Sequence, residues 1–505
     1  MNLVLFVIVT LYIINTMSTS SDTTQENANY VQAKNDQIEH MGDTIEEVNE
    51  YSKIDTALFQ GDMILTKRQA EEVIEGIEAV KNNITKRQAY VDRRYPQTLW
   101  PNKHVYYTFY RNATQDAIRV FKKAVKEWTD VTCINFSQSD IARDRIVVFK
   151  EVGCWSHVGR IGGPQGLSLG SGCESVGTAA HELAHAMGFF HMQSRYDRDD
   201  FITLKMQNFK GDWASQFTKQ SSQTNYNYGL TYDYGGIMHY GPTSVSKNGQ
   251  PVMVTKDINY MQTLGSPMIS FYEKLMMNKH YNCNACSEKF SAICQNNGFP
   301  HPRYCYKCIC PSGYGGDLCD EKPSGCGETL KASDTYKTLK NTVGDKYARQ
   351  SKDDFEMCYY WIEAPAGKQI EVILDSYTDG VATDGCRYGG VEIKTGSDKR
   401  HTGYRFCSKS NVGTHLISTY STVPVVTYSR AWELTTTLRY RIATSGAANS
   451  GKESRTMAGT VRPISLRCED NSMCATLFSK ISCKSSQYGT VFKKTICPKS
   501  CGYCA

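Results

Sequence analysis

The sequence predicts a multidomain protein in which an α+β domain is followed by a small disulfide-stapled module, a β-sandwich and a second disulfide-stapled module. Length supports this prediction, because 505 residues suffice for three or four folded units. Composition supports it too, since 40% hydrophobic and 11% aromatic residues can bury real cores. The 20 cysteines give the order of the modules: they begin at Cys133 and fall into clusters of four, six, four and six.

The N-terminal residues have the pattern of a secretory signal. Residues 3–14 form an apolar run of twelve residues that only Thr10 interrupts. A bilayer span needs about 20 residues, so this run predicts a signal peptide over 1–18 and no transmembrane anchor. An even number of cysteines behind such a signal predicts disulfides and a secreted, extracellular protein. Three Asn-x-Ser/Thr sequences are predicted glycosylation sites that agree with export: Asn83, Asn112 and Asn135.

Residues 19–87 are predicted to be a pro-segment. They lack cysteine, contain one expected helix over 67–80, and end in the dibasic pair Lys86-Arg87, with Arg93-Arg94 as a second candidate cleavage site. Residues 21–83 carry 14 acidic and five basic side chains, a net charge of −9, whereas the whole chain carries +6. This acidic stretch is either a solvated segment or one that lies against a basic body, which later meets an anionic matrix or cell surface.

The stretch His181-Glu182-Leu-Ala-His185-Ala-Met-Gly188-Phe-Phe-His191 has the spacing of a catalytic zinc site. His181 and His185 lie four residues apart, so on a helix they can bind one ion from the same face. Gly188 can take a positive φ and turn the chain, so that His191 supplies a third imidazole. Three histidines leave a fourth position open, as catalytic zinc sites do. Glu182 can reach a water at that position without being a ligand and is the predicted general base.

The longer motif, completed by a methionine turn, is that of the metzincins, and Ile237-Met238-His239-Tyr240 would be the turn. Read through residues 194–199, the stretch resembles the astacin family of zinc metalloendopeptidases. The resemblance implies a two-lobed α+β metzincin catalytic domain over 88–284 that binds one zinc ion per subunit. It also implies that Tyr240 is a further zinc ligand in the active form, which swings to stabilise the oxyanion.

Two positions depart from the astacin pattern. Met192 stands where the family usually has a glutamate that receives the mature N-terminus, so the maturation site stays open between Arg87 and Arg94. Gly236 replaces a serine two residues before the turn methionine. Neither change removes a zinc ligand or the predicted base.

The resemblance also suggests how substrate binds and how the enzyme is kept silent. Residues 155–169 resemble the family's edge strand, to which substrate adds as an antiparallel strand, although their glycines could also mark a loop. Phe59-Gln60-Gly61-Asp62 resembles the astacin aspartate switch, in which the Asp62 carboxylate replaces the zinc water and inhibits the zymogen. A cysteine switch is excluded, because no cysteine precedes Cys133.

The downstream cysteine clusters resemble three known modules. Residues 285–320 resemble an EGF-like module and 326–445 a CUB β-sandwich, and a linker over 446–467 leads to an ShK-type module over 468–504. The acidic residues of calcium-binding versions are missing, and Gln487 replaces the lysine of channel-blocking ShK modules. The resemblances imply the disulfides Cys133–Cys283, Cys154–Cys173, Cys286–Cys305, Cys294–Cys308, Cys310–Cys319, Cys326–Cys358, Cys386–Cys407, Cys468–Cys504, Cys474–Cys497 and Cys483–Cys501.

This order of modules resembles secreted nematode astacins. The favoured interpretation is a secreted zinc endopeptidase, made as a zymogen, that hydrolyses extracellular proteins or peptides with a zinc-activated water and Glu182 as base. One alternative is a catalytically silent adhesion protein that keeps the fold; another is a toxin-like channel ligand, which Gln487 disfavours. Matrix or cell-surface ligands are expected for the CUB and ShK-type modules, and no nucleic-acid partner is expected.

Overall fold

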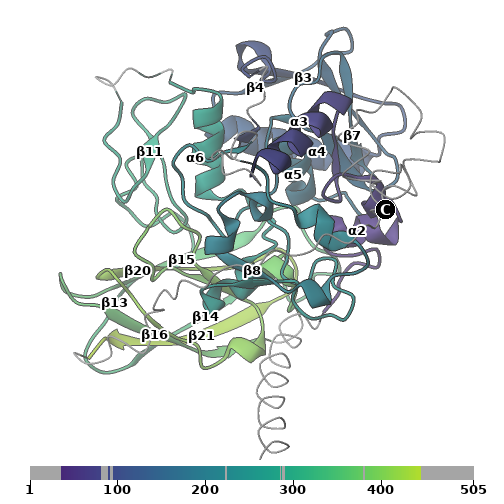
Figure 1. Cartoon of the computed structure of the whole chain (residues 1–505). Coiled ribbons are helices and arrows are strands. Elements are labelled where there is room, and N and C mark those ends of the chain that lie inside the picture. Colours follow the sequence, from purple (N-terminus) through teal and green to yellow (C-terminus); the bar gives the residue numbers. More distant parts are fainter. Residues whose placement is uncertain are drawn as a thin grey trace, which may run out of the picture.

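The computed structural model describes residues 36–80, 89–90, 95–221, 225–284, 286, 291–378 and 381–444. The predicted signal peptide, both dibasic pairs, Asn83, the linker and the ShK-type module with its three disulfides lie outside these residues. The described residues form an α+β domain, a small disulfide-stapled module and a β-sandwich that lies below both in Figure 1. None of the helices described is long and apolar enough to cross a membrane.

The helices begin and end where caps and apolar periodicity place them. Thr114 caps the helix α4 through the backbone N–H of Ala117, and α4 buries Ala117, Val120, Phe121, Ala124 and Trp128 along one face. The predicted helix over 67–80 is α3, with the same bounds. The α-helices are α2 (Ile45–Tyr51), α3 (Lys67–Val80), α4 (Gln115–Val131), α5 (Val176–Ala186) and α6 (Phe271–His280). The 3₁₀ helices are η1 (Asp55–Ala57), η2 (Pro101–Lys103), η3 (Met192–Ser194), η4 (Arg198–Asp200), η5 (Met206–Asn208), η6 (Trp213–Phe217), η7 (Ile258–Thr263), η8 (Asp384–Cys386) and η9 (Lys409–Asn411).

A sheet with the strand order β1-β6-β7-β5-β3-β4 carries the α+β domain. Its strands are β1 (Met63–Ile64), β3 (His104–Phe109), β4 (Asn135–Gln138), β5 (Arg145–Phe149), β6 (Cys154–His157) and β7 (Pro164–Leu169). Strands β7, β5, β3 and β4 are parallel, and β6 is antiparallel to β7. The outermost strand, β1, comes from the predicted pro-segment and pairs with β6 in parallel.

The predicted edge strand over 155–169 is two strands joined by a loop. Gly159, Gly162 and Gly163 have positive φ in this loop, and Gly166 lies within β7. The stretch is therefore part strand and part loop: β6 lies beside β1, and Gly159, Gly162 and Gly163 form the turn between β6 and β7.

Helices α4 and α5 pack on the sheet and on each other. The indole N–H of Trp128 on α4 donates to the carbonyl oxygen of Ala180 on α5 at 3.0 Å. Disulfide Cys133–Cys283 joins the end of α4 to the segment after α6. After α5, β8 (Ile202–Leu204) pairs with β10 (Met253–Thr255), and β9 (Asn225–Tyr226) pairs with β2 (Ala89–Tyr90), which precedes β3 in the chain.

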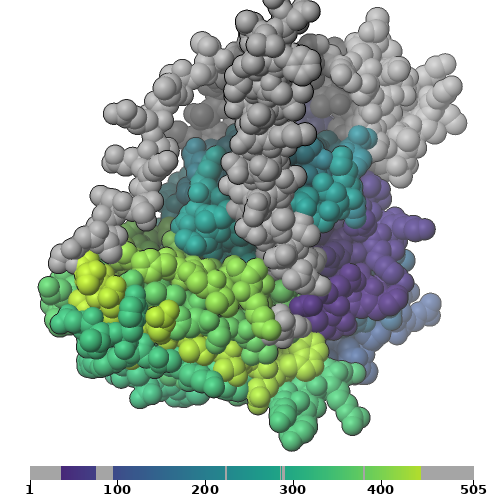
Figure 2. All heavy atoms as spheres, turned by 90° about the horizontal axis from the view of Figure 1, so that it is seen from below, coloured from purple at the N-terminus to yellow at the C-terminus, as the bar shows by residue number. Residues whose placement is uncertain are grey.

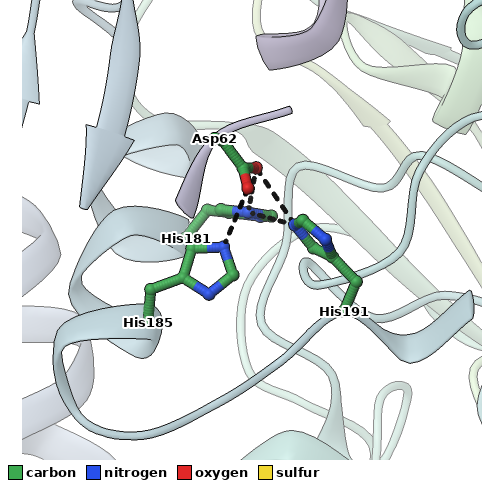
Figure 3. A group of neighbouring side chains, drawn as sticks. All are labelled: Asp62, His181, His185 and His191. Atoms are coloured by element: carbon green, nitrogen blue, oxygen red, sulfur yellow. Dashed lines mark hydrogen bonds and ion pairs between the residues drawn. The ribbon is translucent and has the colours of Figure 1, made fainter. Parts of the chain in front are cut away.

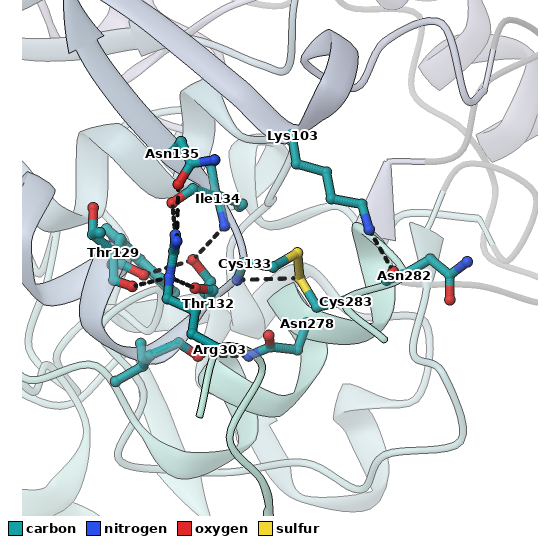
Figure 4. Close-up of a disulfide and its surroundings, with 12 residues drawn as sticks. Lys103, Thr129, Thr132, Cys133, Ile134, Asn135, Asn278, Asn282, Cys283 and Arg303 are labelled. Carbon is teal, nitrogen blue, oxygen red and sulfur yellow. Dashed lines mark hydrogen bonds between the residues drawn. A yellow bond between two sulfur atoms is a disulfide. The ribbon is translucent and has the colours of Figure 1, made fainter. Parts of the chain in front are cut away.

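The small module docks against the C-terminal end of α4 (Figure 4). The guanidinium of Arg303 donates to the carbonyl oxygens of Thr129, Thr132 and Ile134, which satisfies acceptors at the negative end of the helix dipole. The imidazole Nε2 of His301 lies 2.9 Å from the carbonyl oxygen of Asp130. The module contains the strands β11 (Phe299–Pro300) and β12 (Cys308–Ile309), and the disulfides Cys286–Cys305, Cys294–Cys308 and Cys310–Cys319.

The β-sandwich buries alternating apolar side chains between two sheets. One sheet has the order β13-β15-β20-β17-β18 and the other β14-β21-β16-β19. The strands are β13 (Thr329–Lys331), β14 (Lys337–Val343), β15 (Glu356–Glu363), β16 (Ile370–Tyr377), β17 (Gly389–Ile393), β18 (Tyr404–Phe406), β19 (His415–Ile417), β20 (Thr422–Ser429) and β21 (Leu434–Ile442). Disulfides Cys326–Cys358 and Cys386–Cys407 staple it, and Cys154–Cys173 staples the α+β domain. The seven disulfides among the described residues therefore join the cysteines that the resemblances pair.

The sandwich is held against the α+β domain by buried polar contacts. The backbone N–H of Arg405 donates to the hydroxyl of Thr263 at 3.0 Å, and the guanidinium of Arg405 donates to the hydroxyl of Ser266 at 2.6 Å. The backbone N–H of Thr402 donates to the carboxylate of Asp233 at 3.2 Å. These contacts position the sandwich beside the part of the domain that follows the zinc motif.

Candidate metal centre

Helix α5 carries two of the predicted ligands, and a glycine places the third. Ser175 caps α5, and every side chain of the helix is buried, including His181 and His185. Gly188 has φ +111° just after the helix, and a Cβ there would lie 2.9 Å from the imidazole Nε2 of His280. Glycine is therefore required both for the backbone conformation and for the space, and the turn that it permits brings His191 back to the helix.

The three histidines converge on Asp62 of the predicted pro-segment (Figure 3). The Nε2 atoms of His181 and His191 lie 3.1 and 3.0 Å from one carboxylate oxygen, Oδ2, of Asp62. The Nε2 of His185 lies 3.5 Å from the other oxygen, Oδ1. One candidate ligand atom from each of the four residues lies within 4.8 Å of the others, and all four residues are buried.

The other ring nitrogen of each histidine is held by an oxygen acceptor. The Nδ1 atoms of His181 and His185 lie 2.8 and 2.7 Å from the carbonyl oxygens of Ile237 and Phe189. The Nδ1 of His191 lies 3.1 Å from the side-chain oxygen of Gln60. An N–H on each Nδ1 would leave all three Nε2 lone pairs free for a metal, which is the arrangement that orients zinc-binding histidines.

The ionisation of the cluster also suits a cation. Burial lowers the pKa of His191 to about 4, and lowers the pKa of His185 as well, although Asp62 opposes both shifts. Burial raises the pKa of Asp62, but the charges of His191 and His185 outweigh it and hold that pKa well below its usual range. The site therefore offers an ionised carboxylate and, at His185 and His191, imidazoles whose lowered pKa favours the neutral form; both are donors that zinc binds.

Two buried atoms of the cluster lack hydrogen bonds. His185 Nε2 and Asp62 Oδ1 have no hydrogen-bond partner among the described residues. Burying such polar atoms unpaired is costly, and a cation between them would satisfy both. The residues present therefore fit a zinc ion.

Glu182 lies on α5 between the two histidines and is completely buried. Neither of its carboxylate oxygens has a hydrogen-bond partner in the described part of the chain. Burial, and then the charge of Asp62, raises the pKa of Glu182 well above its usual range. This is the environment of a carboxyl group suited to proton transfer near neutral pH.

Tyr240 also reaches the Asp62 carboxylate. Its hydroxyl lies 3.3 Å from Asp62 Oδ2 and donates to the carbonyl oxygen of Gln60, and its ring centroid lies 4.5 Å from that of His191. Burial, and then the charge of Asp62, raises the pKa of the tyrosine well above its usual range, so its hydroxyl is a proton donor at neutral pH. The structure thus brings together all six residues that the sequence singled out for this site.

Comparison with known proteins identifies the family. The family model for astacin, which describes a family of peptidases, matches residues 92–282. The zinc metalloproteinase nas-31 of Caenorhabditis elegans is 45% identical over 461 residues, which cover 89% of this chain and 74% of that protein. The chain belongs to the astacin family. Zinc metalloproteinase nas-32 of the same organism is 35% identical over 466 residues, which cover 91% of this chain and 67% of that protein.

A solved structure gives a further comparison. High choriolytic enzyme 1, a hatching-enzyme zinc protease from the medaka fish Oryzias latipes, is 29% identical and covers 39% of this chain and 100% of its own, with a TM-score of 0.36. As a member of the astacin family, the protein is a zinc metalloproteinase, a peptidase that uses one zinc ion.

Two residues that the sequence did not single out hold the chain next to Asp62: Asn49, which lies in the same predicted pro-segment, and Trp213. Asn49 donates its amide N–H to the carbonyl oxygens of Gly61 and Cys154, at 2.8 and 2.7 Å, and accepts from the backbone N–H of Cys154. The ring of Trp213 covers Gly61, where a Cβ would lie 2.7 Å from the indole. Gly61 also has φ +87°, so glycine at this position has a steric reason that no spacing rule could reveal.

Strand β1 of the predicted pro-segment runs parallel to β6. Met63 and Ile64 pair with Ser156 and His157 in parallel, and the backbone N–H of Ser156 donates to the carbonyl oxygen of Asp62 at 3.0 Å. The expected substrate strand is antiparallel to β6. The predicted pro-segment therefore runs opposite to the direction expected of a substrate.

The two departures from the astacin pattern have local explanations. A Cβ at Gly236 would lie 2.5 Å from a carboxylate oxygen of Glu273, and that carboxylate accepts from the backbone N–H groups of Ile237 and Met238. Glu273 therefore holds the methionine turn and takes the space that a side chain at 236 would need. Met192 is buried, and its sulfur lies 3.7 Å from a guanidinium nitrogen of Arg195.

The two predicted glycosylation sites that are described are exposed. Asn112 lies before α4, and its side-chain amide donates to the carbonyl oxygen of Lys150. Asn135 begins β4, and its side-chain oxygen accepts from Arg303 at 2.8 Å (Figure 4). This contact uses the oxygen, not the nitrogen to which a glycan would be attached.

Proposed function

We propose that this astacin is a secreted endopeptidase, made as a zymogen, in which Glu182 is the general base and Asp62 is the inhibitory ligand. The observation that carries the proposal is the convergence of three histidine Nε2 atoms on the Asp62 carboxylate, 3.0 to 3.5 Å away. A carboxylate from a segment that precedes the catalytic domain fills the position where a substrate would react. Its removal would open that position.

In the active form, His181, His185 and His191 would hold the zinc ion. When bound, zinc supplies the positive charge that polarises the scissile carbonyl and acidifies a water molecule. Glu182 would take the proton from that water and later deliver it to the leaving amine, since its carboxyl is buried on α5 next to the ligand His181. Proton transfer of this kind typically contributes a rate factor of about 10²–10⁴.

Tyr240 would act after the pro-segment leaves. In the latent form its hydroxyl is engaged by Gln60 and Asp62. Freed from both, it would be a further zinc ligand and would then donate to the developing oxyanion; loss of such a donor costs about 10²–10³ in kcat. Strand β6, left without β1, would bind the substrate as an antiparallel strand and align the scissile bond.

The remaining assignments complete the proposal. Residues 1–18 would be the signal peptide, 19–87 the pro-segment, with cleavage after Arg87 or Arg94, and 88–284 the catalytic domain. The small module over 285–320 would be EGF-like, the β-sandwich over 326–445 a CUB module, and 468–504 an ShK-type module. Its substrates would be extracellular proteins or peptides, and Asn83, Asn112 and Asn135 would carry glycans.

A paired measurement of metal and activity tests the proposal. The secreted chain, freed of its pro-segment by a trypsin-like protease, should contain about one zinc ion per chain and cleave casein until a chelator is added. Glu182→Ala should keep the zinc and lose the cleavage. Normal zinc content without peptidase activity in the wild-type protein would overturn the proposal in favour of a silent adhesion protein.

A further inference from the structure

Acidic residues at the start of the described pro-segment lie on a basic site of the β-sandwich. The hydroxyl of Tyr388 donates to the carboxylate of Asp43 at 2.7 Å, and the backbone N–H of Ala382 donates to the carboxylate of Asp36 at 2.8 Å. Figure 2 shows this purple segment against the green side of the sandwich. The pro-segment thus contacts the sandwich as well as the catalytic cleft.

Two arginines of the sandwich supply the positive charge of this site. Arg430 lies with its guanidinium 4.9 Å from the centroid of the Tyr388 ring, and Arg387 comes directly before Tyr388 in the chain. Arg430 and Arg387 are both buried, at 6% and 7% exposure. The Nε atom of each has no hydrogen-bond partner among the described residues. The guanidinium of Arg387 donates through Nη1 to the carbonyl oxygen of Gly265 at 3.1 Å, but an unpaired N–H on a buried guanidinium ion is costly, so each arginine still has an Nε donor that an acceptor would satisfy.

The charges around Arg387 and Arg430 also favour an acidic partner. Burial, and then the nearby charge of Arg387, lowers the pKa of Arg430 to about 10, and Glu39 and Asp43 of the pro-segment oppose that shift. Burial raises the pKa of Glu46, whose carboxyl accepts from the hydroxyl of Ser244, and the charge of Arg387 opposes that shift. Departure of the pro-segment would therefore take three acidic side chains away from the two guanidinium ions.

This site is continuous with the metal centre. The carboxylate of Asp384 in the sandwich accepts from the backbone N–H of Thr243 at 3.0 Å, and Thr243 follows Tyr240 by three residues. On the pro-segment side, the chain runs from Asp43 through α2 to Asn49, which binds Gly61 next to Asp62. A polypeptide can thus contact the arginine pair and the zinc ligands at once.

Strand direction says which part of a substrate would reach the arginines. The pro-segment passes from the sandwich to Asp62 and then runs parallel to β6. A substrate strand antiparallel to β6 would run the other way, from the place of Ile64 past the metal centre and on toward the sandwich. Its residues after the scissile bond would therefore approach Arg387 and Arg430.

We infer that Arg387, Tyr388 and Arg430 form an acidic-peptide exosite, which the pro-segment occupies before maturation and which afterwards binds Asp or Glu side chains located C-terminal to the scissile bond of a protein substrate. The inference rests on the proposed endopeptidase function and names its substrate class. The site selects acidic side chains by charge, and Tyr388 adds a directional hydrogen bond to a carboxylate.

Three peptide substrates with one scissile sequence test the exosite. One carries a flexible extension rich in Asp and Glu after the scissile bond, the second the same extension before it, and the third a Gln- and Asn-rich extension after it. The zinc-loaded mature enzyme should cleave the first with kcat/KM about tenfold above the other two, mainly through KM, and salt should reduce the difference. Equal kcat/KM for the three substrates would overturn the inference.

Charge-neutralising variants connect the preference to the arginines. Arg387→Gln with Arg430→Gln should remove the preference and leave cleavage of the third substrate within about twofold. Replacing both by lysine should retain much of it. Lys346→Gln with Arg349→Gln is the matched control, since it removes two charges from exposed residues of the same sandwich and should change nothing. An equal loss for acidic and neutral substrates would point to a merely structural pair and overturn the assignment.

Binding separates this inference from the enzymatic proposal. A fluorescent peptide of residues 36–47 is titrated into mature Glu182→Ala protein, whose site needs no catalysis. The peptide should bind with about tenfold lower affinity when Arg387 and Arg430 are both glutamine, and Tyr388→Phe should weaken it less. Unchanged affinity would refute the exosite even if the wild-type enzyme cleaves its substrates. If the affinity falls as expected but the wild-type mature protein cleaves nothing, only the proposed function is refuted.

Discussion

Asp62→Asn should make the uncleaved zymogen active. The substitution keeps the shape of the side chain but removes the charge that faces His181 and His191 at 3.1 and 3.0 Å. Zinc binds carboxylate oxygens, whereas the neutral amide of Asn is a much weaker ligand. A loss of about 1.4 kcal/mol or more from the latent arrangement would raise the fraction of open molecules about tenfold or more.

The assay is cleavage of a quenched fluorescent peptide by zymogen in which both dibasic pairs are replaced, so that no mature enzyme can form. Glu71→Gln is the matched control, because it removes the same charge from α3, where the carboxylate lies beside Lys67. We expect activity from Asp62→Asn and none from Glu71→Gln. If zinc-loaded Asp62→Asn zymogen is as inert as the wild type, Asp62 is not the inhibitory group and the reasoning is refuted.

Three other predictions concern the residues around the centre. Tyr240→Phe in the mature enzyme should lower kcat about a hundredfold with little change in KM; an unchanged kcat would exclude the tyrosine from the reaction. Gly188→Ala should destabilise the catalytic domain by about 1–3 kcal/mol in denaturant unfolding, because of its φ of +111° and the nearby His280 ring; full stability would mean that the turn adapts. Burial lowers the pKa of His280 to about 3, so the neutral ring contributes stability above its unfolded pKa of about 6.5, and this contribution is lost as the pH falls from about 6.5 to about 3. His280→Gln should therefore reduce the slope of unfolding free energy against pH in that window by one proton, and an unchanged slope would contradict the assigned pKa.

The sequence could predict the metal ligands because their chemistry is local. The spacing of His181 and His185 on one helix, a glycine turn and His191 are features of eleven consecutive residues, 181–191. Helix α3 and the apolar face of α4 were predictable for the same reason, since helical periodicity is a property of neighbouring residues. Asp62 was recognised only through its resemblance to a family motif.

Contacts between segments that are far apart in the chain could not be predicted from the sequence. The side chain of Asn49 donates to the carbonyl oxygen of Cys154, 105 residues away in the chain, and no sequence pattern around either residue predicts this hydrogen bond. Glu273 explains the glycine at 236 only when both are seen in space. The basic partner of the acidic pro-segment is a similar case: the charge imbalance suggested that one existed, but Arg387 and Arg430 could be found only in the folded chain.

Zinc K-edge anomalous diffraction from crystals of the intact zymogen tests the assignment of the metal centre most directly. We expect one anomalous peak within bonding distance of the Nε2 atoms of His181, His185 and His191 and of the Asp62 carboxylate. A peak elsewhere, or a zinc ion held by the histidines with Asp62 turned away from it, would contradict the assignment.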